Sequence, residues 1–190
     1  MKKRIILVGK SAAGKDHARK ICEQWLGVDY QVSYTTRPPR DEETPGCDYF
    51  FISESEFKKM IKQDLWFEYV QFNGWYYGTT CAQFDMPNSV FIMTPIGLSH
   101  LSENDRDESL VIYFDIPLEY RKNRMYERGR NDDNVNRRIA ADEVDFEFYV
   151  NYDMTITDPY YRIKDLYEAI SEWMDLPSVN EILLQKVHKN

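Results

Sequence analysis

Short, almost purely apolar runs alternate along the chain with longer segments in which apolar residues recur every three to four positions. The runs at 5–8, 89–93 and 110–114 lack the polar alternation of a sheet with one face in water, so they are typical of strands buried on both faces. Such strands belong to parallel sheets covered by helices. The expected strands are 4–8, 31–36, 89–94, 110–114 and 154–157, and the expected helices are 15–26, 54–63, 118–128, 134–150 and 160–174.

The stretch 33–80 interrupts this rhythm. It contains several prolines followed by short aromatic runs, a pattern that predicts a small β-rich insertion. The 190 residues are therefore expected to form one domain, 1–190, whose core comprises 1–32 and 81–190. No function is assigned to the short amphipathic segment 179–187.

Composition and charge narrow the classes of function. With 43% hydrophobic residues the chain can form a substantial core, and its formal net charge of -8 argues against non-specific nucleic-acid binding. The three cysteines are widely spaced and form no metal-binding pattern, which is typical of a reducing compartment. No apolar stretch approaches the length of a membrane span, and no signal peptide is recognisable. These features favour a cytoplasmic monomer or homodimer that acts on small molecules, without membrane or nucleic-acid partners.

A glycine-rich turn follows the first apolar run and precedes the first helical segment. The glycines permit tight backbone geometry, successive N–H groups then face an anion, and the helix N-terminus adds partial positive charge. The lysine supplies an ammonium for the outer phosphates of a nucleoside triphosphate. The sequence therefore predicts an ATP site formed by Gly9, Lys10, Ser11, Ala12, Ala13, Gly14, Lys15 and Asp16.

Asp16 stands where such loops usually have a serine or threonine. As a carboxylate in the first helical turn it favours the helix dipole by about 0.3–1 kcal/mol. At about 6 Å from a phosphate charge, however, it would be repelled by roughly 3 kcal/mol at an effective dielectric near 20. A bridging Mg²⁺ reverses that sign, because carboxylate oxygen is a good Mg²⁺ ligand. We therefore expect Asp16 to hold Mg²⁺ directly or through water.

A second candidate phosphate site lies in the predicted insertion. Arg37 and Arg40 are forked, permanently charged donors that match phosphate oxygens in bidentate geometry, and the prolines between them stiffen the backbone. Tyr49 and Tyr77 each add a hydroxyl donor. Taken alone, this composition also fits a solvated surface loop of arginines and glutamates. Beside a phosphate-binding loop, a second phosphate clamp is the better explanation.

The same insertion carries an extended pattern that is highly specific. The run from Ser33 to Tyr49 reads S-x-T-T-R-x-P-R-x-x-E-x-x-G-x-D-Y, and it is followed by Trp66-Phe67-Glu68-Tyr69 and Gly74-Trp75-Tyr76-Tyr77-Gly78-Thr79. In these segments, and from the first strand to about Asp158, the chain closely resembles guanylate kinase.

That resemblance implies a fold and an activity. The fold would be the three-layer α/β sandwich of P-loop nucleoside monophosphate kinases, with a parallel core sheet, a GMP-binding insertion at 33–80 and a helical lid at about 125–148. The activity would be transfer of the ATP γ-phosphoryl group to GMP or dGMP with Mg²⁺, giving ADP and GDP or dGDP.

The resemblance also implies roles for individual residues of the insertion. A carboxylate at Glu68 accepts hydrogen bonds from guanine N1–H and the 2-amino group, and adenine offers no such donor pair. The alternative explanation, in which Glu68 has no ligand, is a surface carboxylate on an edge strand. The residues implied to bind GMP are Ser33, Glu68 and Thr79 at the guanine and Arg37, Arg40, Tyr49 and Tyr77 at the phosphate, with Glu43 supporting the clamp.

Arginines beyond residue 117 resemble those of the kinase lid. Arg124 and Arg128 are four residues apart and share one helical face, and Arg138 falls on a further lid position. Together with Lys15, these three are implied to be catalytic, because they would neutralise the equatorial oxygens of the transferring phosphoryl group. The neighbouring Arg121, Arg130 and Arg137 fit an exposed helical row of arginines equally well.

The chain departs from the family pattern at three positions. Ile92 and Thr94 stand where the family usually has acidic residues, and Thr157 stands where it often has an amide or acid near the ATP base. These departures leave the strictness of base selection open. Two alternatives follow: a related kinase with another acceptor, such as ribose 1,5-bisphosphate, and a guanylate-kinase-like module that binds phosphorylated protein segments without catalysis. The complete phosphate loop and the full arginine cluster favour the kinase that acts on GMP.

Overall fold

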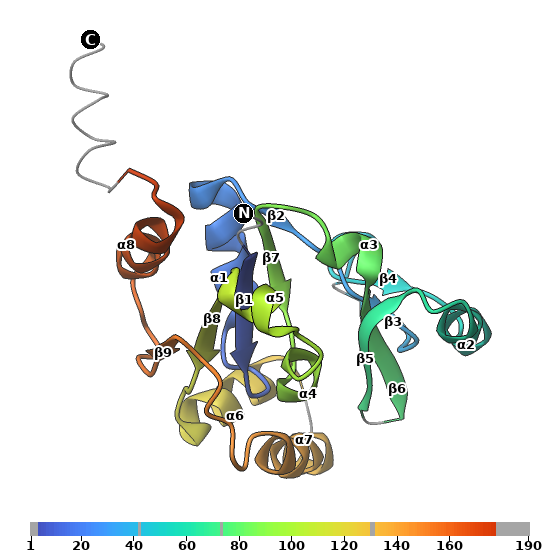
Figure 1. Cartoon of the computed structure of the whole chain (residues 1–190). Helices are drawn as coiled ribbons and strands as arrows, with labels where there is room; N and C mark the ends of the chain where they lie inside the picture. The colour runs from blue at the N-terminus through green and yellow to red at the C-terminus, as the bar shows by residue number, and fades with distance from the viewer. Residues whose placement is uncertain (1–3, 42, 73, 130–131, 178–190) are drawn as a thin grey trace.

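The computed structural model describes residues 4–41, 43–72, 74–129 and 132–177, and Figure 1 shows two separate sheets. The larger sheet has five parallel strands in the order β2-β7-β1-β8-β9. They are β1 (Arg4–Gly9), β2 (Asp29–Tyr30), β7 (Ser89–Ile92), β8 (Ser109–Phe114) and β9 (Met154–Ile156). The smaller sheet has the order β4-β3-β6-β5 and comprises β3 (Tyr34–Thr35), β4 (Phe50–Phe51), β5 (Trp66–Phe72) and β6 (Trp75–Thr80).

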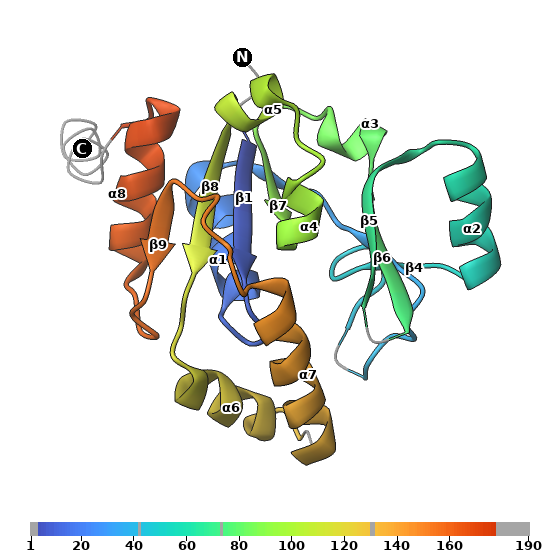
Figure 2. The same ribbon diagram turned by 60° about the horizontal axis from the view of Figure 1, so that its bottom comes forward.

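The central strand β1 is buried along its whole length, as its apolar run predicts. Ile5 and Leu7 pack in one cluster with residues of α1 (Lys15–Ile21) and α8 (Ile163–Met174). Ile6 and Val8 pack in a second cluster with residues of α3 (Cys81–Phe84) and α4 (Pro95–Leu98). Figure 2 shows α1 and α4 on opposite sides of the sheet. Because alternate side chains of a strand point to opposite faces, the sheet is the middle of three layers, and the predicted α/β class is confirmed.

The remaining helices are η1 (Cys22–Leu26), a π-helical continuation of α1, and α2 (Glu54–Lys62), α5 (Glu103–Asp107), α6 (Leu118–Glu127) and α7 (Asp132–Asp145). Both α6 and α7 lie beyond the carboxyl ends of the core strands (Figures 1 and 2). That edge is where ligands bind in open α/β sheets. Among the described residues, no helix is long and apolar enough to cross a membrane.

Two predicted helices are shorter in the structure than their periodicity suggests. The helix expected to extend to residue 150 ends at Asp145, because Phe146 and Tyr149 turn inward and pack on the ring of Tyr113. The last helix begins at Ile163 rather than at residue 160, since the Asp158 carboxylate accepts the Tyr160 N–H in a turn of its own. The predicted segment 179–187 lies outside the described residues.

The single strand predicted at 31–36 is wrong. Within that range only β3 (Tyr34–Thr35) is a strand, and it pairs with β4 and β6, whereas β2 lies just before the range and pairs with β7 in the core. Between them the chain crosses from one sheet to the other, and the Val32 carbonyl accepts a hydrogen bond from Gln83 Nε2 at 2.6 Å. A local alternation of apolar and polar residues indicates extended backbone, but it does not determine which strand this backbone pairs with.

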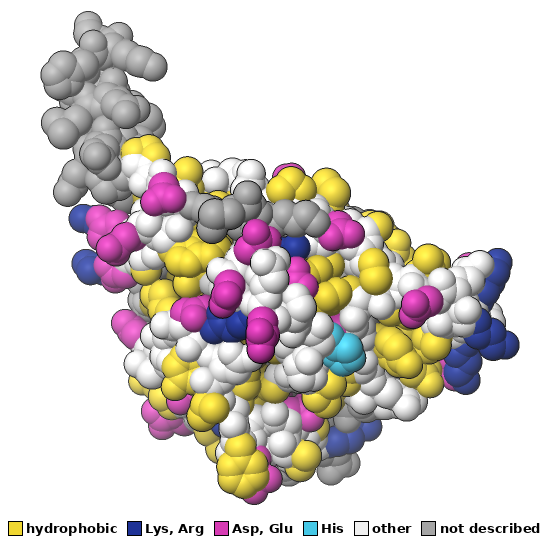
Figure 3. All heavy atoms as spheres, viewed as in Figure 1, with side chains coloured by type: hydrophobic (Ala, Val, Ile, Leu, Met, Phe, Trp, Pro, Cys, Tyr) yellow, Lys and Arg dark blue, Asp and Glu magenta, His cyan; other side chains and the backbone are white. Residues whose placement is uncertain are grey.

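The small sheet and α2 stand at the opposite end of the molecule from α8 (Figure 1). A capping box formed by Ser53 and Glu56 starts α2, and Phe57, its buried residue, stacks on Trp66 with ring centroids 4.1 Å apart. Lysine side chains of α2 gather on the outer surface at this end (Figure 3). Every strand of this sheet lies within the predicted insertion, while the boundaries at 32 and 81 remain a prediction.

Candidate functional site

A cavity of about 230 Å³ opens where the core, the small sheet and α7 meet. Its walls come from the glycine-rich loop, the 33–49 segment, β5, the carboxyl end of β7, and α7. Thirteen of the predicted site residues line it together: Gly9, Ser11, Ala12, Lys15, Asp16, Ser33, Arg37, Arg40, Tyr49, Glu68, Tyr77, Arg128 and Arg138. The others, which lie behind the wall or beside it, are Lys10, Ala13, Gly14, Glu43, Thr79 and Arg124. The chain thus brings together the two regions that the sequence predicts to bind phosphate.

The glycine-rich loop depends on two glycines for two different reasons. A Cβ on Gly9 would lie 2.9 Å from the Phe114 carbonyl oxygen, so the loop leaves β1 through a gap that admits no side chain. Gly14 has φ of +101°, a conformation that side-chain-bearing residues rarely adopt, and it is the residue that caps the N-terminus of α1. The first turn of α1 therefore points its N–H groups into the loop, which favours an anion there.

Lys15 is held inside this loop by main-chain oxygens. Its Nζ donates to the Gly9 carbonyl at 2.6 Å and to the Lys10 carbonyl at 3.1 Å. Burial lowers the pKa of Lys15, and the nearby carboxylates of Asp16 and Asp142 act against that shift. Among the residues that the structure describes, no carboxylate lies within hydrogen-bonding distance of the ammonium, so its carbonyl contacts can be exchanged for phosphate oxygens.

Asp16 is exposed on the cavity wall, one residue after Lys15. Among the residues that the structure describes, no group of three or more histidine, cysteine or acidic side chains is placed to hold a metal ion. A single carboxylate nevertheless suits Mg²⁺, which commonly takes one or two protein carboxylates together with substrate phosphates and water. Asp16 thus fits a metal that arrives with a nucleotide.

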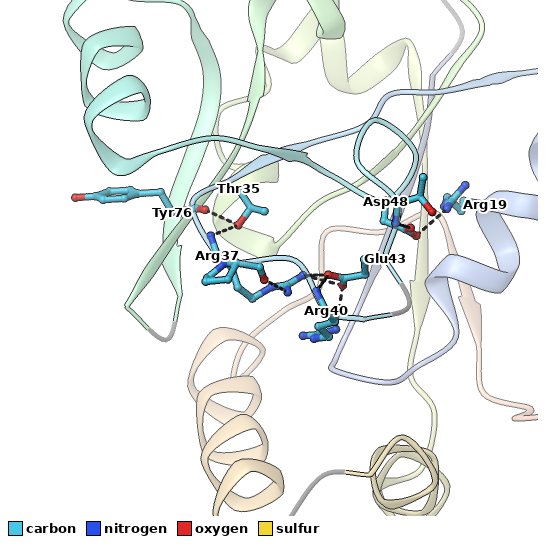
Figure 4. A network of polar contacts seen from close by, with 9 residues as sticks. Arg19, Thr35, Arg37, Arg40, Glu43, Asp48 and Tyr76 are labelled. Atoms are coloured by element: carbon cyan, nitrogen blue, oxygen red, sulfur yellow. Dashed lines mark hydrogen bonds and ion pairs between the residues drawn. The ribbon is translucent and has the colours of Figure 1, made fainter.

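Across the cavity, Arg37 and Arg40 share one carboxylate (Figure 4). Arg37 Nη2 donates to both oxygens of Glu43, at 2.7 and 2.9 Å, and Arg40 donates to the same carboxylate through its backbone N–H at 2.9 Å and through Nη1 at 3.3 Å. Glu43 thus fixes the 37–40 turn and orients both guanidinium groups. It sits beside the cavity wall, in the supporting place that the sequence resemblance implies.

Arg37 is anchored further by its own main chain. Its backbone N–H donates to Thr35 Oγ1, whose hydroxyl donates in turn to the Tyr76 carbonyl of β6 (Figure 4). Among the residues described, the buried Nε of Arg37 has no hydrogen-bond acceptor. An unsatisfied buried donor is costly, so this guanidinium retains a donor for an incoming anion.

Tyr49 and Tyr77 pack edge to face, with ring centroids 5.9 Å apart, and the Arg37 guanidinium lies 5.5 Å from the Tyr49 ring. Burial is the main cause that raises the pKa of Tyr49. Its phenol therefore stays neutral at ordinary pH and keeps its proton to donate. Both tyrosines line the same wall as Arg37 and Arg40, as the sequence predicts for a phosphate clamp.

Glu68 points into the cavity from the buried middle of β5 and is only 6% exposed. Burial raises the pKa of its carboxyl to about 7, although Thr79 and His100 act in the opposite direction. Thr79 pairs with it across the β5–β6 ladder, and the buried Thr79 hydroxyl has no hydrogen-bond partner among the described residues. A Cβ on Gly97 would lie 3.2 Å from Glu68 Oε2, a contact so tight that the carboxylate would have to shift by a few tenths of an ångström. The alternative explanation is right that Glu68 lies on an edge strand, but wrong that its carboxylate is on the surface, because the side chain is buried.

The walls around Glu68 are apolar, and sequence reasoning missed most of them. Val70 and Phe72 follow Glu68 at alternate positions of β5 and therefore share its face. Ile92, Met93 and Thr94 close the cavity from the end of β7. The period of two along β5 was the available signal. Thr94 Oγ1 accepts the Gly97 N–H as the N-cap of α4, so one lone pair of this hydroxyl is already used.

The lid arginines do not all face the cavity. Arg138 on α7 and Arg128 after α6 line it, whereas Arg124 donates to the main-chain oxygens of Ala12 at 3.2 Å and Pro159 at 2.6 Å. Burial lowers the pKa of Arg138, and the positive charges of Arg40 and Arg37 act in the same direction. Arg138 therefore lies near the clamp across the cavity.

Arg121 and Arg137 have different surroundings. Arg121 is only 4% exposed and donates to the Asp142 carboxylate and the Ile116 carbonyl, so its interpretation as an exposed arginine is wrong. Its burial follows from packing of α6 against the loop and α7. Arg137 is exposed and donates to Asn134, as an exposed helical arginine should. Arg130 lies outside the described residues.

Comparisons with known proteins agree with this architecture. The sequence model of the family described as guanylate kinase matches residues 1–175. A guanylate kinase of Fusobacterium nucleatum is 30% identical over 158 residues, which cover 80% of this chain and 85% of that relative. One from Bacillus subtilis is 31% identical over 160 residues, covering 80% and 78% respectively. The crystal structure of guanylate kinase from Anaplasma phagocytophilum has a TM-score of 0.67 at 22% identity, covering 92% of this chain and 86% of that one, and shares its fold.

Proposed function

The chain belongs to the guanylate kinase family, and on that premise we propose that it transfers the γ-phosphoryl group of ATP to GMP or dGMP. The products are ADP and GDP or dGDP. One observation carries the proposal: the glycine-rich loop with Lys15 and the clamp of Arg37 and Arg40 face a single cavity. A donor phosphate and an acceptor phosphate bound there would be brought within reach of each other.

No protein side chain has to form a covalent intermediate. A phosphate oxygen of GMP attacks the γ-phosphorus, the bond from that phosphorus to the oxygen bridging to the β-phosphate breaks, and ADP leaves with that oxygen. Catalysis is then a matter of position and charge. Lys15 binds the outer phosphates, and Arg128 and Arg138 neutralise the charge that spreads over the transferring group.

We further propose that ATP is bound as its Mg²⁺ complex and that Asp16 holds the metal, directly or through water. Bound Mg²⁺ would neutralise phosphate charge that Asp16 alone would repel. Asp16→Ala is expected to raise the Mg²⁺ concentration needed for half-maximal rate by about tenfold. The measurement is initial rate against free Mg²⁺ at saturating nucleotides, with Asp16→Ser as the variant that restores a smaller oxygen ligand. An unchanged Mg²⁺ requirement in Asp16→Ala would remove this role.

Base selection is proposed to rest on Glu68. A buried carboxylate with apolar neighbours accepts a pair of N–H donors well and rejects a base that presents acceptors instead, because its charge would then stay unpaired. Guanine presents such a pair along one edge. The acceptor ribose 1,5-bisphosphate has no base and would leave the Glu68 carboxyl without a partner.

An assay of ADP release tests the acceptor directly. With ATP and Mg²⁺ held constant, GMP and dGMP are expected to accelerate ADP release, while AMP, UMP and ribose 1,5-bisphosphate leave it near the rate without acceptor. Stimulation by ribose 1,5-bisphosphate alone would assign the chain to the related kinase. Absence of stimulation by any acceptor, with intact binding of a phosphorylated peptide, would assign it to the non-catalytic modules.

We also propose that the protein works in the cytoplasm, as a monomer or a homodimer, and that residues 33–80 move as the GMP-binding insertion and about 125–148 as the lid. The three cysteines are free, which suits a reducing compartment. One chain supplies both walls of the cavity, so neither oligomeric state would change the site.

A further inference from the structure

A buried carboxylate on α7 is bound to the glycine-rich loop itself. The Ser11 N–H donates to both oxygens of Asp142, at 3.0 and 2.9 Å, and the Ser11 hydroxyl donates to Oδ1 at 3.0 Å. Asp142 is only 4% exposed. Asp142 itself lines the cavity, and its carboxylate accepts a main-chain donor of the predicted phosphate loop, although 131 residues separate the two in sequence.

The negative charge of Asp142 is balanced by a buried arginine. Arg121 Nη1 donates to Asp142 Oδ2 at 3.0 Å, while its Nε donates to the Ile116 carbonyl at 3.0 Å. Both side chains of this ion pair are about 5% exposed. A buried carboxylate with an arginine and three donor contacts from Ser11 is satisfied where it lies, so it does not need a ligand to complete it.

Apolar contacts support the same junction. Met125 of α6 and Val135 and Ile139 of α7 form a small buried cluster against which Ala12 of the loop packs. The loop therefore contacts α7 in two ways: Ser11 makes hydrogen bonds to it, and the neighbouring Ala12 makes apolar contacts with it. The junction joins three elements: the loop, α6 and α7.

Arg138 precedes Asp142 by four residues on α7, so the two side chains share one face of the helix. Anchoring Asp142 on Ser11 therefore fixes the height and rotation at which Arg138 meets the cavity. Arg138 lines the cavity and feels the charges of Arg40 and Arg37 across it. Like charges repel, so an anchor on the same helix opposes the displacement of Arg138 from the cavity.

We propose that Asp142 is a positioning residue that docks α7 on the phosphate loop through Ser11, so that Arg138 is held over the site of phosphoryl transfer. This inference rests on the proposed kinase function. It adds a coupling: the loop that receives ATP is also the surface on which the lid closes. Ser11 then serves the lid through its N–H and hydroxyl, while the loop N–H groups nearer α1 serve the phosphates.

The test uses Asp142→Asn, which keeps the shape of the side chain but removes the charge that pairs with Arg121. Its matched control is Glu143→Gln, which removes one carboxylate from the next position of the same helix, where the side chain is exposed. We expect kcat to fall by about 10²-fold in Asp142→Asn, as for a catalytic group displaced by roughly 1 Å, with the KM for GMP changed less than threefold. Glu143→Gln should match the unsubstituted protein.

Two further measurements separate docking from simple loss of stability. Hydrogen exchange of the α7 amides should speed up in Asp142→Asn while that of β1 and β8 stays unchanged, and ATP hydrolysis without acceptor should rise relative to transfer, because an undocked lid admits water. If Asp142→Asn proves too unstable to assay, Ser11→Ala removes one of the contacts and should shift the same readouts in the same direction by a few fold.

Unchanged kcat with unchanged α7 exchange in Asp142→Asn would overturn the proposal. Tighter ATP binding with faster turnover would also overturn it, because Asp142 would then be a competitor for the phosphate site rather than an anchor. Failure of the proposed function is distinguishable: the unsubstituted protein would not phosphorylate GMP, yet α7 exchange would still report whether Asp142 docks the helix.

Discussion

In the proposed donor region, the glycine-rich loop with Lys15, the groups offered to an anion are main-chain amides and one ammonium. In the proposed acceptor region, Arg37 and Arg40 across the cavity, they are guanidinium groups held by a carboxylate. Lys15 donates to two carbonyl oxygens of its own loop, which cost little to exchange. Arg37 and Arg40 are both bonded to Glu43, which orients them before any ligand arrives. The first region is therefore arranged by backbone geometry, and the second by a charged hydrogen-bond network.

The difference has a functional consequence. In the proposed reaction, negative charge on the phosphate oxygens is redistributed between bound ATP and the transition state. A flexible ammonium can adjust its position to neutralise it in both. The acceptor region has to hold one phosphate in a fixed orientation. Planar guanidinium groups that Glu43 holds in place do that better than a flexible ammonium. Substitutions in the donor region should therefore act mainly on kcat, and those in the acceptor region mainly on the KM for GMP.

The largest effect is expected for Lys15→Ala. It removes a lysine of the cavity wall, and the loss of transition-state charge neutralisation should lower kcat by about 10³-fold. The measurement is steady-state GMP phosphorylation, with circular dichroism and thermal unfolding as checks that the fold is intact. A folded Lys15→Ala variant with full activity would refute the assignment of the donor region.

Arg37→Lys tests the acceptor region, because it keeps the charge but removes the fork that holds Glu43 and the phosphate. The KM for GMP should rise by about 10²-fold, since charged hydrogen bonds of this kind contribute roughly 1.5–3 kcal/mol each. The KM for ATP should change little. A variant in which both KM values rose equally would show that the two regions are not separate in function.

Glu68 predicts that GMP binding and ATP binding depend differently on pH. Because burial raises the pKa of its carboxyl to about 7, the free protein loses the anionic form as pH falls below that value. Guanine needs the ionised form as acceptor, so the dissociation constant for GMP should rise about tenfold per pH unit below 7, while ATP binding stays nearly constant. Titration calorimetry from pH 5.5 to 8 measures both.

The same carboxyl should affect stability, with a definite sign. Its pKa in the folded state lies above the usual 4.5, so between pH 4.5 and 7 the folded protein binds more protons than the unfolded chain. Its contribution to the free energy of unfolding therefore falls as pH rises through that window, by roughly 3 kcal/mol. Urea unfolding of Glu68→Gln should show the variant gaining relative stability from pH 5 to pH 8. Parallel pH profiles for the two proteins would contradict the raised pKa.

The smallest effect is expected where the two regions touch. Arg19 of α1 lies 3.6 Å from Asp48 of the 33–49 segment and stacks on Tyr30, as Figure 4 shows for the ion pair. Partly exposed pairs contribute about 0.2–1 kcal/mol, so Asp48→Asn should raise the KM for GMP only two- to fivefold. Glu23→Gln is the matched control, because Glu23 pairs with the same arginine from within its own helical segment. Equal effects of both variants would show that Asp48 does not link the regions.

The sequence predicted those parts whose signal is local. The apolar runs predicted β1, β7 and β8, because a strand buried on both faces is apolar throughout. The loop at 9–16 and the cluster at 33–49 predicted two phosphate sites, because each is a contiguous motif with a fixed spacing. The Glu68 position came from the family resemblance, whereas its apolar neighbours on β5 did not.

Only the tertiary structure decided which distant residues meet. It shortened the predicted strand at 31–36 to Tyr34–Thr35 in the small sheet, buried Arg121 against Asp142, and turned Arg124 toward main-chain carbonyls. Nothing in the sequence distinguishes Asp142 from the other acidic residues of its charged helix. Backbone propensity and motif spacing act within a few residues of the chain. The partner of a buried charge is distant in sequence and comes within reach only when the helices pack on the sheet.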